Sequence, residues 1–336
     1  MSTKTKVKTP KKALSRDSFA YKLLNFKELS VIMCLVVLMT IGIIVNPNFM
    51  NKPNWWALFR TASFMGIPAI PVAFLLMTKS QDLSVGQTVA CSSIIFAIMC
   101  CKMNIPVPVA FIIIMLFGIL IGVINGVLIV DVGVPAFLVT LSMQFILFGI
   151  ASQLVQGVSI TGFPEWFPEI GAWKLFDFFT VEMIVFAIIV VIGHLFLTKT
   201  VSGQQLLMIG TNARTAELCG MKVKKIRRGA HIITSACATL SAVLFCARTG
   251  QASSGTGGEW DLQLMIAAMI GGTSNYGGRG SVIGATLGII YMRVLMNVLI
   301  MIGLDGDWQY VGMGVSMIFA IVFDYWRTKV TMSQVR

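Results

Sequence analysis

Charged residues are scarce in this chain, and acidic ones are scarcer than basic ones. Of 336 residues, 14 are Asp or Glu, 26 are Lys or Arg and 2 are His, while 56% are hydrophobic. A soluble domain averages about 25% charged residues, whereas this chain has 12%. Such a composition leaves too little polar surface to cover a water-soluble core. Apolar runs near the roughly 20 residues that cross a bilayer recur, so we predict an all-α polytopic membrane protein embedded in a lipid bilayer.

Residue sets for catalysis or metal binding are also missing from the sequence. The two histidines, His194 and His231, flank a polar segment, and we expect both near the membrane surface without a catalytic role. The seven cysteines form no C-x-x-C pair, which favours free thiols that pack as small residues. We therefore predict no catalytic residues, no metal site, no cofactor in this chain and no enzymatic activity.

The sequence contains no complete nucleotide-binding loop. A P-loop needs Lys and Ser/Thr directly after its last glycine. The glycine-rich stretch 272–277 has the glycine spacing, but Gly278 and Arg279 occupy those two positions. We predict a tight turn at this stretch, because glycine permits close backbone packing. If transport is driven by ATP, the ATP and Mg²⁺ belong to a separate chain.

The N-terminus carries no cleavable signal peptide, because its first 28 residues are too polar and basic. We predict a cytoplasmic tail over residues 1–28. The formal net charge is +12, and a strongly positive charge is also typical of proteins that bind nucleic acid. Here the basic residues flank the apolar runs, which is typical of a membrane topology signal, so we predict no nucleic acid partner.

Ten apolar segments predict about ten transmembrane helices within residues 29–326, followed by a cytoplasmic tail at 327–336. An eight-span arrangement, with the short segments merged, is the main alternative. The segments are 29–45, 57–78, 82–101, 106–130, 135–155, 179–197, 229–247, 262–272, 281–302 and 310–325.

The distribution of charge predicts which ends of these segments face the cytoplasm. With ten spans, 20 of the 26 Lys and Arg residues fall on one side, including Lys79, Arg279 and the loop 199–228. The acidic residues of the other loops, among them Glu165, Glu169 and Asp305, fall on the opposite side. Because Lys and Arg concentrate in cytoplasmic loops, we predict that both termini and the loop 199–228 are cytoplasmic.

The loop 199–228 is the longest polar interruption between apolar blocks. It holds seven basic residues against one acid, Glu217. Asn212, or else Thr211, can cap the first turn of a short helix, and Gly220 can end that helix in a left-handed conformation. A helix of about seven residues is unstable alone in water, so a partner must hold it. We predict that it docks onto a soluble motor protein.

Two segments in different parts of the chain look alike. Asp82 and Leu83 open the third apolar segment, and Asp261 and Leu262 open the eighth. Segments five spans apart run in opposite directions, as an inverted five-plus-five repeat requires, and such matched short segments mark substrate pathways in transporters. A chance match of a common dipeptide is the alternative interpretation.

Polar residues within or at the start of apolar segments are candidates for a substrate pathway. Each is costly in lipid unless it faces a cavity or a partner. Amides and hydroxyls suit an uncharged, hydroxylated solute, and the absence of acidic rows opposes an ion-coupled pump. Interhelical hydrogen bonds are the alternative role for each residue. The candidates are Asp82, Ser84, Gln87, Asn125, Gln144 and Asn297.

Four motifs resemble the membrane-spanning subunits of ribose-type ABC sugar importers, the binding-protein-dependent monosaccharide transport family. They are D-L-S-V-G at 82–86, V-P-A-F-L-V-T at 134–140, G-T-N-A-R-T-A-E-L-C-G-M-K-V at 210–223 and I-A-A-M-I-G-G-T-S-N-Y-G-G-R-G-S-V-I-G-A at 266–285. The resemblance covers nearly all of the chain after residue 29. In two places the chain departs from the family: Ser80 and Gln81 replace its usual Gly-Ile, and the acids Glu259 and Asp261 are shifted.

The resemblance implies a permease in the bacterial plasma (inner) membrane that moves a monosaccharide or small polyol by alternating access. It also implies a second permease subunit, identical or related, a cytoplasmic ABC ATPase and an extracytoplasmic sugar-binding protein. A same-superfamily permease for amino acids or nucleosides is an alternative, and an ion-coupled secondary transporter or a structural scaffold are weaker ones. The family's ATPase-coupling motif maps onto Gly210, Asn212, Ala213, Ala216, Glu217 and Gly220.

Overall fold

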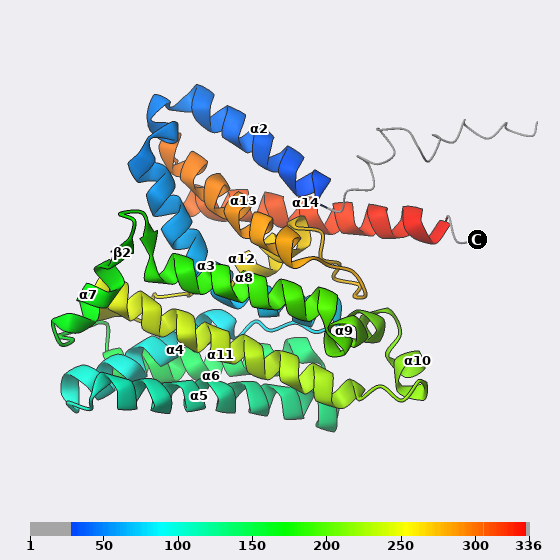
Figure 1. The fold of residues 1–336 in the computed structure, drawn as a ribbon, viewed down its shortest axis with the longest axis horizontal. Coiled ribbons are helices and arrows are strands. Elements are labelled where there is room, and N and C mark those ends of the chain that lie inside the picture. Colours follow the sequence, from blue (N-terminus) through cyan, green and yellow to red (C-terminus); the bar gives the residue numbers. More distant parts are fainter. Residues whose placement is uncertain (1–27, 305, 334–336) are drawn as a thin grey trace, which may run out of the picture.

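A computed structural model describes residues 28–304 and 306–333. Each of the ten apolar segments coincides with a helix, and most of the described chain is helical (Figure 1). The ten helices are α2 (Leu29–Val45), α3 (Lys52–Met77), α4 (Val85–Ala97), α5 (Val107–Val127), α6 (Ala136–Val155), α8 (Val181–Lys199), α11 (Val223–Thr249), α12 (Trp260–Ile270), α13 (Val282–Met301) and α14 (Gly306–Ser333).

Seven helices among the described residues are long and apolar enough to cross a membrane. They are α3, α4 with the π-helical turn that continues it to Lys102, α5 with the π-helical turn that continues it to Val132, α6, α8, α11 and α13. Val31–Val45 of α2 and the whole of α12 are shorter apolar helices. The polytopic helical class is therefore confirmed, and the count of ten crossings stays a prediction. The predicted tail 1–28 lies almost wholly outside the described residues, and α14 extends through most of the predicted tail 327–336.

The remaining elements are short and connect the long helices. They are η1 (Pro47–Met50), η2 (Ile98–Lys102), η3 (Leu128–Val132), α7 (Trp166–Ala172), α9 (Val201–Thr211), α10 (Ala213–Leu218) and four two-residue strands, β1 (Ile160–Thr161), β2 (Lys174–Leu175), β3 (Phe179–Thr180) and β4 (Gln251–Ala252). The strands pair antiparallel as β1 with β4 and β2 with β3. The helix α9 was not expected, because only a single short helix was predicted in this loop.

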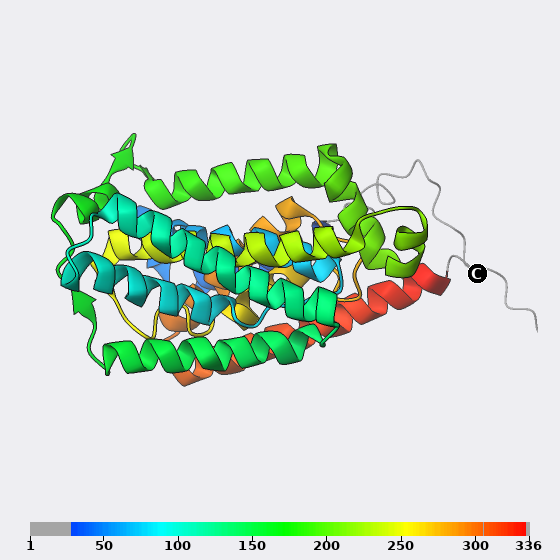
Figure 2. The same cartoon turned by 90° about the horizontal axis from the view of Figure 1, so that it is seen from below.

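The core forms around α3 and α11, which pack against most of the other long helices (Figures 1 and 2). Glycines let α5 approach α11 closely. A β-carbon on Gly118 would lie 2.1 Å from the hydroxyl oxygen of Thr239, and one on Gly122 would lie 2.6 Å from the α-carbon of Ile232. Such contacts suit a membrane protein, where helices associate through close packing of small residues.

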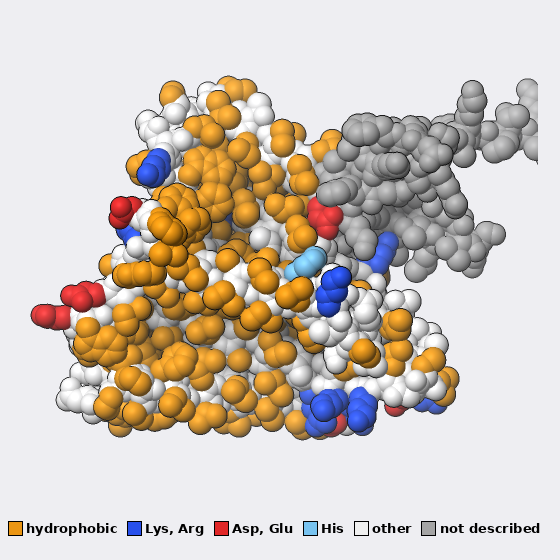
Figure 3. Space-filling model, in the orientation of Figure 1, with side chains coloured by type: hydrophobic (Ala, Val, Ile, Leu, Met, Phe, Trp, Pro, Cys, Tyr) orange, Lys and Arg blue, Asp and Glu red, His pale blue; other side chains and the backbone are white. Residues whose placement is uncertain are grey.

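Segments that the charge pattern places together meet at one end of the bundle. In Figure 3, a group of blue side chains with red ones beside it lies at the lower right, near the start of α11, and the left end, near α7, carries both red and blue side chains. Lys79 donates a hydrogen bond to the carbonyl of Thr211 (3.3 Å), and the backbone N–H of Gly278 donates to the carbonyl of Met77 (2.8 Å). The predicted grouping of Lys79, the loop 199–228 and the loop 271–281 at one end is thus confirmed.

Candidate functional site

The helix α10 begins and ends as its sequence predicts. The Asn212 side chain accepts a hydrogen bond from the backbone N–H of Thr215 (3.1 Å), which confirms it as the N-cap. Gly220 has φ +78°, a left-handed conformation that glycine adopts without strain. A side chain at Gly220 would meet no neighbour within 4 Å, so the end of α10 is open to a partner.

The two faces of α10 differ in what they contact. Ala216 is buried against the chain itself, so its small side chain serves internal packing. The exposed side carries Leu218, which is 75% exposed, and the surface ion pair of Arg214 and Glu217 (3.3 Å). Asn212 is exposed and Ala213 is half-buried. The coupling role of these residues stays a prediction, and Leu218 joins them as a residue that the sequence pattern did not single out.

The end of α9 packs closely against two other segments of the chain. A β-carbon on Gly210 would lie 1.7 Å from the carbonyl oxygen of Met77 and 2.4 Å from the backbone nitrogen of Gly278. Real β-carbons do not approach other atoms that closely, so only glycine fits here. Gly210 therefore joins the α9–α10 pair to the end of α3 and to the loop 271–281.

A non-helical link, residues 78–84, leads from this junction to the start of α4. Arg227 of α11 donates a hydrogen bond to the carbonyl of Thr78 (2.8 Å). Further along, the Ser80 hydroxyl lies 2.9 Å from Nε2 of His231. Two hydrogen bonds, one at Thr78 and one at Ser80, thus hold the link against α11.

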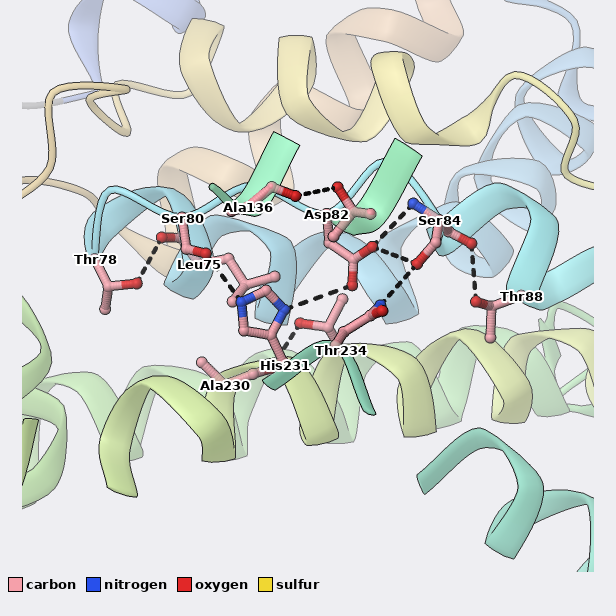
Figure 4. Close-up of polar contacts among 12 residues, drawn as sticks. Leu75, Thr78, Ser80, Asp82, Ser84, Thr88, Ala136, Ala230, His231 and Thr234 are labelled. Carbon is pink, nitrogen blue, oxygen red and sulfur yellow. Dashed lines mark hydrogen bonds and ion pairs between the residues drawn. The ribbon is translucent and has the colours of Figure 1, made fainter. Parts of the chain in front are cut away.

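Asp82 lies at the centre of a buried polar network (Figure 4). One of its carboxylate oxygens accepts hydrogen bonds from the backbone N–H (2.9 Å) and the hydroxyl (2.5 Å) of Ser84. The Asn125 amide donates to the same hydroxyl oxygen (3.1 Å). The other carboxylate oxygen lies 3.8 Å from Nδ1 of His231. The structure therefore brings together three predicted residues, Asp82 and Ser84 from the link and Asn125 from α5.

His231 is buried inside the protein, and its position relative to the membrane surface stays a prediction. Its side chain is 0% exposed and lies between Ser80 and Asp82. The histidine stands after a run of basic residues, and this position suggested a surface location. The His231 side chain lies on the inward face of α11 and contacts the link 78–84, about 150 residues away in the sequence.

The starts of α4 and α12 meet inside the molecule. A β-carbon on Gly86 would lie 2.3 Å from the carbonyl oxygen of Gly257 and 3.5 Å from the backbone nitrogen of Asp261. From this meeting point α4 runs toward β1 and β4, whereas α12 leads to the loop 271–281 at the opposite end. The two Asp-Leu segments thus run in opposite directions, as predicted, and the inverted repeat of the two halves stays a prediction.

A polar cavity of about 580 Å³ opens beside these two helix starts. Gln87, a predicted pathway residue, lies in its wall. Arg293 of α13 donates a hydrogen bond to the Gln263 amide oxygen, and the Gln263 amide donates to a carboxylate oxygen of Glu259 (3.4 Å). The Tyr310 hydroxyl donates to the other oxygen of Glu259. The cavity therefore presents amide, guanidinium and carboxylate groups from four segments of the chain, with Trp260 beside them.

The other two pathway candidates have different surroundings. The Gln144 amide donates to a carboxylate oxygen of Asp261 (3.4 Å), so it joins α6 to the start of α12 next to the cavity. Asn297 exchanges hydrogen bonds with Asn54 (2.8 and 3.1 Å) and so joins α13 to α3. Asn297 thus takes the interhelical role that was its alternative, and it is not one of the residues that line the cavity.

A second cavity, of about 620 Å³, lies between α3 and α8 and has a different character. Its wall is almost entirely hydrophobic, with Phe59, Met183 and Phe186 among the lining residues. A hydroxylated solute would find few hydrogen-bond partners there. The polar cavity is therefore the better candidate for binding such a solute.

Comparisons with known proteins agree with one another. The chain is 30% identical over 319 residues to the galactose/methyl galactoside import permease protein MglC of Haemophilus influenzae, covering 89% of this chain and 94% of that protein. It is 28% identical to the fructose import permease protein FruG of Bifidobacterium longum, with 95% of each chain covered. It is 27% identical to the ribose import permease protein RbsC of Haemophilus influenzae, covering 86% of this chain and 90% of that protein.

No solved structure matches the chain. A family model matches residues 55–321, which include α10, the Asp82 network and all the residues that line the polar cavity. The chain therefore belongs to the family described as branched-chain amino acid transport system / permease component.

Proposed function

We propose that this protein is the permease subunit of an ATP-driven, binding-protein-dependent importer for a monosaccharide or similar small polyol. It is a transport component of the bacterial inner membrane and crosses that membrane several times, as its family and its apolar helices indicate. The relatives import galactose, fructose and ribose by their names. The polar cavity beside α4 and α12 is the observation that carries the proposal.

The lining of this cavity matches the chemistry of a sugar. Gln87 and Gln263 offer both donors and acceptors, Arg293 offers donors only, and Glu259 offers acceptors only. Sugar hydroxyls need both kinds of partner. The ring face of Trp260 can cover the less polar face of the sugar. A volume of about 580 Å³ lies in the range of small-molecule sites and leaves room for a monosaccharide with water.

A second permease subunit completes this pathway in our proposal. Gln87, Glu259 and Arg293 line a cavity that opens to the surface of the chain, and such groups are costly against hydrocarbon. Phe148 of α6 and Gln309 of α14 lie at its wall, and Figure 2 shows α6 and α14 along the same side of the bundle. A second copy, or a related permease, placed against this side would enclose the cavity.

The cytoplasmic ATPase contacts α10 in our proposal. The basic loop 199–228 faces the cytoplasm by the distribution of Lys and Arg, and α10 presents Leu218 and Glu217 outward. ATPase closure presses on α10 and α9. The junction at Gly210 passes the movement to the link 78–84 and so to the start of α4, where Gln87 lines the cavity. An external binding protein delivers the solute at the opposite end, near α7.

An amino acid substrate is the second candidate, because the family description names branched-chain amino acids. Arg293 would then pair with the carboxylate of the amino acid. A ligand screen of the partner binding protein separates the two, with pentoses, hexoses, polyols, amino acids and nucleosides tested by thermal shift. Stabilisation by a monosaccharide or polyol, followed by its ATP-dependent uptake in proteoliposomes, supports the proposal. Stabilisation by amino acids alone would refute it.

A further inference from the structure

A groove between α8–α9 and α11 lies outside the proposed pathway. Its volume is about 370 Å³, and Phe74 of α3 is one of its lining residues. Phe196, Ile226 and Ile233 make one part apolar, and Ser202, Lys222 and Lys225 make the other part polar. Along α11 the lining changes from Lys222 to Ile233 over roughly 16 Å, at 1.5 Å per helical residue. This change parallels the passage from the surface of a membrane into its hydrocarbon.

The charges at the polar part of the groove are not balanced within the described chain. Arg214 pairs with Glu217, and Arg228 pairs with Asp131 (3.2 Å). Lys222 and Lys225 are exposed and make no ion pair with a described carboxylate, and the lining of the groove includes no acid. They also stand at the start of α11, where the helix dipole itself favours an anion.

Gly229 gives a second and independent observation. It lies inside α11, where glycine lowers helix stability relative to alanine. A β-carbon at Gly229 would meet nothing within 4 Å, so packing within this chain does not require glycine there. Because Gly229 lines the groove, the missing side chain keeps the groove open.

The apolar part of the groove continues into a surface that suits lipid. Figure 3 shows the face that carries α8 and α11 as mostly hydrophobic. On α8, exposed apolar side chains lead away from the groove; they are Ile188, Val191, Ile192 and Leu195. A soluble partner would leave these side chains uncovered, whereas an acyl chain covers them along with the groove.

We propose that this groove binds an anionic phospholipid of the cytoplasmic leaflet, with its phosphate at Lys222 and Lys225 and an acyl chain along Gly229 and Ile233. The inference rests on the cytoplasmic placement of the loop 199–228 in the proposed function. It does not depend on the solute, because lipid retention is measured without transport. A lipid here contacts α9 and α11 on either side of α10, so it steadies the segment that couples to the ATPase.

Native mass spectrometry of the purified full-length chain tests this proposal. The chain is mixed in detergent with equal amounts of dioleoyl phosphatidylglycerol and dioleoyl phosphatidylcholine. The wild-type chain should retain phosphatidylglycerol preferentially. Each lysine near a membrane surface is worth about a fivefold change in affinity, so K222A/K225A should lower phosphatidylglycerol retention about 25-fold. Lys224→Ala removes one positive charge from a lysine that does not line the groove, and it should change retention less than twofold, compared with about fivefold for each groove lysine.

A second variant fills the groove without removing a charge. Gly229→Leu adds a good helix former where no neighbour blocks it, so the chain should fold and stay monodisperse. Its retention of both lipids at this site should be lost. Equal retention of the two lipids by the wild-type chain, or unchanged retention in both variants, would overturn the proposal. Loss of ATPase co-purification in K222A/K225A with unchanged lipid retention would assign the groove to the ATPase instead, and would overturn it too.

Discussion

At the scale of single residues, Asp82 shows how a buried charge is held in this protein. It accepts two hydrogen bonds from Ser84 and lies beside the ring of His231, and all three side chains are buried. Asp82→Ala removes the carboxylate oxygen that accepts both bonds, and so leaves the backbone N–H and the hydroxyl of Ser84 without this acceptor. Because hydrogen bonds to charged groups contribute up to about 3 kcal/mol, we expect an apparent Tm lower by roughly 5–10 °C.

Asp131→Ala is the matched control for Asp82→Ala. It removes a carboxylate from a partly exposed ion pair with Arg228, which contributes about 0–1 kcal/mol. Its Tm in the same detergent should stay close to that of the wild-type chain. Equal Tm values for the two variants would show that the Asp82 network does not stabilise the fold.

The cavity residue Gln87 gives a prediction about transport. Gln87→Met keeps the size of the side chain and removes its donor and acceptor. One hydrogen bond to the solute contributes about 0.5–1.5 kcal/mol, so we expect the uptake rate at low solute concentration to fall roughly 2- to 10-fold. The measurement is ATP-dependent uptake by the complete complex in proteoliposomes.

Gln153→Met is the control for Gln87→Met, because Gln153 is exposed on α6 and does not line the cavity. Its uptake should match that of the wild-type chain. If Gln87→Met also transports at the wild-type rate, the cavity is not the solute path.

The sequence could reveal some of these residues and not others. Asp82, Ser84 and Asn125 were predicted because a polar group at or in an apolar segment needs a partner or a cavity. Gln263 was not singled out, although it interrupts an apolar run in the same way as Gln87. The pairing of His231 with Ser80 depends on contacts across about 150 residues of sequence, and no local pattern shows such a contact.

At the scale of elements, the exposed side of α10 gives a prediction about assembly. The family's coupling motif includes Ala216, but that side chain is buried within this chain, so a bulky substitute would disturb the packing of α10 itself. Leu218 is exposed and is the better probe. Leu218→Glu should leave expression and Tm unchanged and reduce ATPase co-purification at least tenfold, because the change places a charge in the proposed contact.

Thr215→Glu is the matched control for Leu218→Glu, because it places the same charge on the same helix. Ile188→Glu would not serve, because α8 is expected to face lipid. Thr215 is exposed on α10 and its side chain is polar already. Co-purification reduced equally by both changes would indicate a general charge effect. Co-purification unchanged in Leu218→Glu would contradict docking through this side of α10.

The junction of α9 with the link 78–84 gives a prediction about coupling. Gly210→Ala places a methyl group where the Met77 carbonyl lies, so the end of α9 must shift. We expect the ATPase to associate still, and solute uptake per ATP hydrolysed to fall severalfold. Gly149→Ala is the control, because a β-carbon there meets nothing within 4 Å. Uptake unchanged in Gly210→Ala would show that the junction does not transmit movement.

Local signals explain why α10 was predicted and α9 was missed. Asn212 and Gly220 are a cap and a stop that act within a few residues, and they appear directly in the sequence. The sequence of α9 contains Gly203 and Gly210, which lower helix propensity. Leu206 and Ile209 of α9 are buried against the rest of the chain, so tertiary packing stabilises a helix that its local sequence disfavours.

At the scale of the whole molecule, the pattern of charge predicted which loops share an end. Contacts of Lys79 with Thr211 and of Gly278 with Met77 confirm this grouping. The meeting of Gly86 with Gly257 was not predictable, because it requires two helix starts to be placed in space relative to each other. The opposite directions of α4 and α12 followed from span parity alone, since an odd number of spans reverses the chain.

The predicted topology can be tested with the chain's own exposed cysteine. Cys219 is exposed next to α10, whereas Cys91, Cys100 and Cys246 are buried. A membrane-impermeant maleimide should label Cys219 in inside-out vesicles and leave it unlabelled in right-side-out vesicles. In a Cys219→Ser background, Tyr276→Cys should label like Cys219, and Val158→Cys at the opposite end should label only in right-side-out vesicles. Both positions are exposed in the structure.

The outcome at Tyr276 decides between the arrangements of spans. With ten crossings, α12 brings the chain back to the cytoplasmic end before α13 begins, so Tyr276 is reached from the same side as Cys219. If α12 and α13 formed one crossing, as an eight-span arrangement allows, Tyr276 would lie within the bilayer and label from neither side. Labelling of Tyr276→Cys from the outside would instead contradict both the predicted parity and the cytoplasmic docking of α10, because Lys79, Thr211 and Gly278 meet at this one end.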